Sequence, residues 1–72
     1  MSRTFTTLQK RLSLNLLRLR KAAGFSQEAL ALEADIDRTY VSQIERCLGN
    51  PSLLVLCKLA KVLNVDVTEF LE

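Results

Sequence analysis

With 72 residues, of which 49% are hydrophobic, the chain has room for one small domain and is too apolar to be a disordered segment. Ten basic and eight acidic residues leave a net charge of +2, which permits a nucleic-acid partner without requiring one. Two cysteines, Cys47 and Cys57, and no histidine argue against a zinc site or a disulfide scaffold. We expect two reduced thiols and no metal, cofactor or small-molecule ligand.

Residues 1–17 contain no apolar run of signal-peptide or membrane length, so we expect a cytoplasmic protein without a membrane partner. Hydrophobic residues recur every three or four positions from this region up to Gly24, and a glycine typically follows the last residue of a helix. This spacing predicts a helix over about residues 7–23.

Two short helices are predicted next. Ser26 is an N-cap candidate before residues 27–34, and Asp37 is the corresponding candidate before residues 38–46. Each helix is too short to be stable alone and must pack against its neighbours. Two such helices separated by three or four residues have the arrangement of a helix-turn-helix, here spanning about residues 26–46.

The C-terminal third predicts two more helices. A turn over residues 47–52 ends with Pro51 or Ser52 at the start of a helix over residues 53–63, which Asn64 can close with a left-handed cap. The stretch from residue 65 to 71 reads as a last short helix. We therefore expect an all-α fold with five helices in one compact domain over residues 1–72.

The outer face of the predicted helix 38–46 carries hydrogen-bond donors and no acidic residue. At helical spacing this face is made of Arg38, Thr39, Ser42, Gln43 and Arg46. Arginine can contact guanine and glutamine can contact adenine, each with two hydrogen bonds, in the major groove. The pattern predicts that this helix enters the major groove of double-stranded DNA.

Three runs of sequence at these spacings resemble the Xre/Cro/C1 helix-turn-helix family over about residues 12–71: LRKAAGFSQEALA at 19–31, DRTYVSQIER at 37–46 and NPSL at 50–53. Within that family, the DRTYVSQIER run looks most like the controller proteins of restriction–modification systems, although phage-type repressors and stand-alone regulators carry similar runs. The resemblance implies a lambda-repressor-like fold and a sequence-specific transcriptional regulator that binds operator half-sites.

The resemblance also implies a role for each matching residue. It assigns base contacts to Arg38, Thr39, Ser42 and Gln43, and backbone contacts to Gln27, Tyr40, Arg46 and Asn50. It further implies a buried ion pair between Arg20 and Glu45 that ties the first helix to the recognition helix.

The loop after the recognition helix departs from the family pattern. Cys47 stands where the family usually has glycine, and Leu48 and Gly49 stand where it often has basic residues. A left-handed cap costs cysteine roughly 1 kcal/mol more than glycine. We therefore expect a rearranged turn with Gly49 in the strained position, and a weak phosphate contact from this loop.

One recognition helix reads too few base pairs to select a site in a genome, so we expect a symmetric homodimer. Its interface is expected in the C-terminal part, about residues 52–72, through Val65, Val67, Phe70 and Leu71. The alternative is that Phe70 and Leu71 close the core of their own protomer.

Two other classes of function fit these residues less well. A protein-interaction module would present a more apolar face than that of residues 38–46, although a regulator can contact DNA and RNA polymerase at once, and Glu28, Glu33 and Asp35 are candidates for such a contact. An enzyme is disfavoured because the chain has no histidine, no evident carboxylate pair and no glycine-rich phosphate loop.

Overall fold

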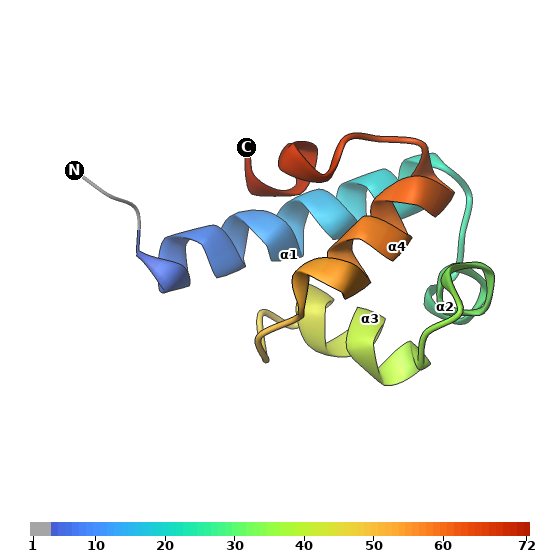
Figure 1. Ribbon diagram of the computed structural model, residues 1–72, viewed down its shortest axis with the longest axis horizontal. Helices are drawn as coiled ribbons and strands as arrows, with labels where there is room; N and C mark the ends of the chain where they lie inside the picture. The colour runs from blue at the N-terminus through green and yellow to red at the C-terminus, as the bar shows by residue number, and fades with distance from the viewer. Residues whose placement is uncertain (1–3) are drawn as a thin grey trace.

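The computed structural model describes residues 4–72. Within this range the chain forms four α-helices, one 3-10 helix and no strand, in the order α1 (Phe5–Ala22), α2 (Gln27–Ala34), α3 (Arg38–Glu45), α4 (Leu53–Leu63) and η1 (Val67–Leu71). The long α1 lies behind α4, while α2 and α3 are neighbours, with α3 below α4 and α2 at the right of the view (Figure 1). The expected all-α architecture is confirmed.

Each helix begins at a side chain that accepts a hydrogen bond from the first turn. The Oγ of Ser26 accepts from the amide of Ala29 at 2.9 Å, and an Oδ1 of Asp37 accepts from the amide of Thr39 at 2.7 Å. Ser52 caps α4 in the same way. These caps satisfy amides that have no partner inside the helix, which is why α2, α3 and α4 begin where the sequence predicted. Helix α1 begins earlier than predicted, because Thr4 is its N-cap.

All four α-helices end in the same way. A residue in the left-handed conformation follows each helix, and the next amide donates to a carbonyl five residues back. This is the Schellman motif, which satisfies carbonyls that the end of a helix leaves without a partner. The left-handed residues are Gly24, Asp35, Cys47 and Asn64, with φ of 80°, 57°, 60° and 56°.

The prediction of a fifth α-helix is wrong. Residues Val67–Leu71 wind as a 3-10 helix, closed at its start by a reciprocal pair in which Asp66 accepts from the amide of Thr68 and Glu69 accepts from the amide of Asp66, both at 2.9 Å. In a 3-10 helix each amide donates to the carbonyl three residues back, as the amide of Glu69 does to the carbonyl of Asp66 at 3.0 Å.

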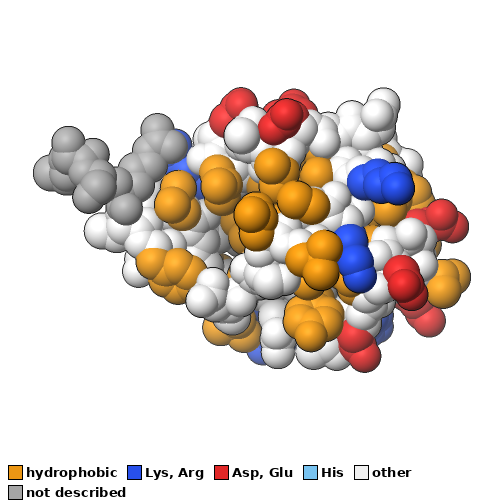
Figure 2. Space-filling view, viewed as in Figure 1, with side chains coloured by type: hydrophobic (Ala, Val, Ile, Leu, Met, Phe, Trp, Pro, Cys, Tyr) orange, Lys and Arg blue, Asp and Glu red, His pale blue; other side chains and the backbone are white. Residues whose placement is uncertain are grey.

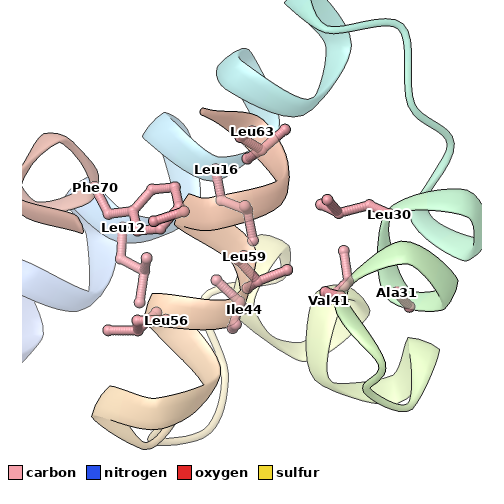
Figure 3. Packing of buried hydrophobic residues seen from close by; sticks show 12 residues of the cluster. Leu12, Leu16, Leu30, Ala31, Val41, Ile44, Leu56, Leu59, Leu63 and Phe70 are labelled. Atoms are coloured by element: carbon pink, nitrogen blue, oxygen red, sulfur yellow. The ribbon is translucent and has the colours of Figure 1, made fainter. Parts of the chain in front are cut away.

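The hydrophobic core lies where α1, α4 and η1 meet α2 and α3 (Figure 3). Its members with less than 2% of their surface exposed are Phe70, Leu16, Leu30, Leu59 and Val41, drawn from all five helices. Burying side chains of this size stabilises a fold by about 1.5–3 kcal/mol each. The short α2 and α3 owe their stability to this packing, since neither is long enough to persist alone.

Phe70 belongs to this core, and the prediction that its side chain forms a dimer interface is wrong. The ring is 0% exposed and lies beside Leu12 in Figure 3. The Nδ2 of Asn15 holds the segment in place by donating to the carbonyls of Phe70 and Glu72 at 3.0 and 2.9 Å. Phe70 therefore closes the core of its own protomer, which was the alternative prediction for this residue.

The remaining candidates for the interface are Val65, Val67 and Leu71, which are half-buried against the same core. More apolar surface is left on α4, where Leu53 and Leu54 are 69% and 65% exposed. In Figure 2, viewed with α4 in front, hydrophobic side chains form a band across the middle of the molecule. No helix among residues 4–72 combines the length and the apolar character that crossing a membrane requires.

Candidate nucleic-acid interface

Helices α2 and α3 are joined by three residues, and the turn between them is tightly bonded. Asp35 takes the left-handed position, and the amide of Ile36 donates to the carbonyl of Ala31 at 3.0 Å. Asp37 then caps α3. The geometry is that of a helix-turn-helix, in which the second helix is oriented by the first.

Helix α3 has one buried face and one exposed face. Val41 and Ile44 are 0% and 3% exposed and point into the core. The opposite side consists of the residues predicted to contact bases and backbone: Arg38, Thr39, Gln43 and Arg46, which are exposed, and Ser42, which is half-buried. The only charges on this side are the two guanidinium groups, so the face that points away from the protein is cationic and rich in donors.

The cap of α3 has an electrostatic consequence. Hydrogen bonds from the side chain and the backbone amide of Thr39 hold the pKa of Asp37 below its ordinary value, with the charge of Arg38 adding to the effect. Asp37 is therefore ionised at neutral pH. A negative charge at the start of a helix also interacts favourably with the helix dipole.

The Arg20–Glu45 ion pair implied by the family resemblance is present. The Nε and Nη2 of Arg20 donate to the two carboxylate oxygens of Glu45 at 2.6 and 2.9 Å, and the Nη1 donates to the carbonyl of Phe25 at 2.8 Å. The side chains are only 10% and 5% exposed, and the hydrogen bond to Glu45 raises the pKa of Arg20. Arg20 therefore links α1 to the end of α3 and to the segment just before α2.

Gln27 extends this cluster to the start of α2. Its Nε2 donates to the Oε1 of Glu45 at 3.0 Å, and its side chain is half-buried. Gln27, which is predicted to contact the DNA backbone, is thus already hydrogen-bonded to Glu45 within the protein. A glutamine amide carries two hydrogens, so one remains to donate to a phosphate while Glu45 holds the other.

A loop follows α3, and here one expectation about its backbone needs correction. Cys47 itself takes the left-handed position of the Schellman motif, with φ of 60°, and the amide of Leu48 donates to the carbonyl of Gln43 at 2.8 Å. Gly49 also has a positive φ, 77°, so it adds a second turn and does not replace the first. The helix keeps the ordinary C-terminal geometry although it lacks the usual glycine.

Three of the predicted contact residues are brought together beside this loop. Tyr40, Gln43 and Asn50 line a hollow of about 280 Å³ between α3, the loop and the first turn of α4. Tyr40 is 47% exposed, and Leu48, on the same hollow, is 46% exposed. The end of the recognition helix therefore opens onto a depression with an apolar and aromatic rim.

Two residues of α1 that the sequence did not single out also hold α3 and the loop. The Oγ of Ser13, which is 8% exposed, donates to the carbonyl of Glu45 at 2.8 Å. The Nε2 of Gln9 donates to the carbonyl of Gly49 at 2.8 Å. The sequence offered one signal: Gln9 and Ser13 directly follow Leu8 and Leu12, two of the hydrophobic residues that recur every three or four positions along the predicted first helix.

Comparison with known proteins identifies the family. The model of the HTH_3 helix-turn-helix family matches residues 16–70. The chain belongs to the helix-turn-helix family. It is 45% identical over 56 residues to the control protein C.BamHI of Bacillus amyloliquefaciens, covering 78% of this chain and 68% of that protein.

Solved structures agree with this assignment. The restriction–modification controller C.AhdI of Aeromonas hydrophila superposes with a TM-score of 0.81 and 39% identity, covering 86% of this chain and 94% of that one. SinR of Bacillus subtilis, solved in complex with DNA, gives a TM-score of 0.79 and 35% identity, covering 85% and 98%. The resemblance to Xre/Cro/C1 proteins, and among them to restriction–modification controllers, is confirmed.

Proposed function

We propose that this protein is a sequence-specific DNA-binding transcription regulator that places α3 in the major groove. The observation that carries the proposal is the exposed face of α3, which presents two arginines and three uncharged polar side chains while Val41 and Ile44 anchor its other side in the core. A short helix held in this way is suited to groove insertion. The DNA complex of the similar SinR supports the same use of the fold.

The residues divide by chemistry into those that read bases and those that hold the backbone. We assign base contacts to Arg38, Thr39, Ser42 and Gln43, whose donors and methyl group match the edges of base pairs. We assign backbone contacts to Gln27, Tyr40, Arg46 and Asn50. Backbone contacts fix the register of the protein on the duplex without reading its sequence.

A homodimer is part of the proposal, with its interface on α4. Because Phe70 is buried within the protomer, we infer that the interface centres on Leu53, Leu54 and the exposed Cys57, with Val65, Val67 and Leu71 beside them. Adjacent exposed leucines on one helix are the kind of surface that a second copy can cover about a two-fold axis. Two copies would then present two recognition helices to one site.

The similarity to C.BamHI and C.AhdI supports a more specific role as a restriction–modification controller, with residues 4–72 acting as one domain. We also propose RNA polymerase as a partner. Glu28 and Leu32, which is 78% exposed, lie one turn apart on one face of α2, and the exposed Asp35 follows at the C-cap of that helix. That face lies outside the set of residues assigned to DNA.

Selection of binding sites from random double-stranded DNA tests the proposal. We expect enrichment of a two-fold symmetric sequence whose half-sites lie about one helical turn, or a small multiple of it, apart. Enrichment of an asymmetric sequence would contradict the dimer. No enrichment over the input pool, with protein shown to be folded by circular dichroism, would contradict sequence-specific binding.

A further inference from the structure

Gln9, near the N-terminal end of α1, contacts both sides of the loop that follows the recognition helix. Its Nε2 donates to the carbonyl of Gly49 at 2.8 Å. Its Oε1 accepts a hydrogen bond from the thiol of Cys47, with 3.9 Å between the oxygen and the sulfur. These partners lie 40 and 38 residues away in the sequence. One side-chain amide therefore spans the turn from its first residue to its third.

The loop is a segment whose backbone needs such a restraint. Two of the three residues it spans have a positive φ, and one of these is the non-glycine Cys47. Leu48, Gly49 and Asn50 are all exposed, so little packing holds them. A strained and exposed turn persists only where neighbouring contacts fix it.

The position of the loop bears directly on a base-contact residue. A Cβ added at Gly49 would lie 3.5 Å from the Oε1 of Gln43 and 3.9 Å from its Cβ. The side chain of Gln43 therefore lies close to Gly49, on the side of its backbone where a Cβ would point, and both residues line the same hollow. Through Gly49, the amide of Gln9 on α1 reaches the reading face of α3.

We propose that Gln9 is a positioning residue that holds residues 47–49, and with them the side chain of Gln43, in the arrangement that meets DNA. The inference rests on the proposed DNA-binding function. A loop ordered before binding loses less conformational entropy in the complex, so fixing it in advance strengthens binding without a new contact to DNA. Gln9 would compensate for the absence of glycine at position 47.

The first arm of the test uses the free protein and the thiol of Cys47 as a reporter. In a Cys57→Ser background, Cys47 is the only cysteine, and its rate of alkylation by iodoacetamide reports how accessible the loop leaves this half-buried thiol. Gln9→Met keeps the length of the side chain and removes both polar contacts. We expect alkylation to accelerate about two- to ten-fold, the factor that matches loss of one net hydrogen bond. Thr6→Ala, an exposed change on α1, is the control and should leave the rate unchanged.

The second arm measures affinity for the selected operator by fluorescence anisotropy over a range of salt concentrations. We expect Gln9→Met to weaken binding about two- to ten-fold. The slope of affinity against salt should stay that of the parent, because no phosphate contact is removed. Circular dichroism melting of each variant checks that the fold is intact.

An unchanged alkylation rate in Gln9→Met would overturn the proposal, because the loop would not depend on Gln9. Faster alkylation with unchanged operator affinity would also overturn it, because the loop conformation would not matter for binding. Failure of the parent protein to prefer its operator would instead refute the proposed function, and the alkylation arm would still report whether Gln9 holds the loop.

Discussion

Cys47 occupies a backbone position that favours glycine, and replacing it with glycine should stabilise the protein. Its φ is 60°, in the C-terminal motif of α3, where the first amide beyond it bonds back to the carbonyl of Gln43. The equivalent position after α1 is Gly24, with φ of 80°. The two positions share one geometry and differ in the side chain.

The size of the effect follows from two opposing contributions. A left-handed conformation costs an L-residue roughly 1–2 kcal/mol, and glycine adopts it freely. Glycine in turn loses about 0.4–1 kcal/mol more backbone freedom when the chain folds. The half-buried thiol also gives up its contact with Gln9. We expect Cys47→Gly to raise the free energy of unfolding by about 0.5–1 kcal/mol, which is about 2–8 °C in Tm for a domain of this size.

Urea unfolding at one fixed protein concentration measures this change, since dimerisation makes stability depend on concentration. Cys47→Ala keeps the Cβ and should gain nothing. Gly24→Ala is the reverse experiment at a site where a Cβ meets no atom within 4 Å, and it should destabilise by a similar amount. If Gly24→Ala behaves so and Cys47→Gly gains nothing, the left-handed backbone at position 47 carries no strain and the reasoning fails.

Three further predictions concern the ion pair, a helix cap and the dimer. Glu45→Ala leaves the guanidinium of Arg20 buried without its partner and should cost about 3–5 kcal/mol in urea unfolding; a loss below about 1 kcal/mol would mean that water solvates the pair. Because its pKa is lowered in the folded state, Asp37 contributes stability that is complete above the ordinary value of 3.8 and is lost as the pH falls through the folded pKa. Asp37→Asn still caps α3 but does not titrate, so its stability should fall less between about pH 5 and about pH 2, and equal pH profiles would contradict this. Leu54→Glu should convert dimer to monomer in sedimentation equilibrium, whereas Leu14→Glu, at a residue that is 68% exposed against 65% for Leu54, should not; a dimeric Leu54→Glu would move the interface away from α4.

The helix boundaries could be predicted because they depend on local chemistry. Three side chains each accept a hydrogen bond from a backbone amide two or three residues further on: those of Ser26, Asp37 and Ser52. Asn64, in the left-handed conformation, ends α4 through bonds within the last turn of that helix. Such contacts can be inferred from sequence spacing alone. The exposed face of α3 followed in the same way from helical periodicity once Val41 and Ile44 were taken as core.

What could not be predicted depends on contacts between distant parts of the chain. Phe70 and Leu71 are equally apolar, yet only Phe70 is fully buried, because Asn15 on α1 holds the C-terminal segment in one orientation. The link from Gln9 to the loop joins residues 40 apart, and no motif marks it. A polar residue on a helix indicates a surface position and does not show which loop will lie against it.

The base preference of Arg38→Ala tests the central claim that α3 reads DNA through its exposed face. On a panel of operators carrying each substitution in the half-site, we expect Arg38→Ala to lose discrimination at one base pair and about 1–3 kcal/mol of affinity for the preferred operator. Gln27→Ala, measured beside it, should weaken all operators alike, since a backbone contact carries no base information. An Arg38→Ala variant that discriminates among operators as the parent does would contradict the account.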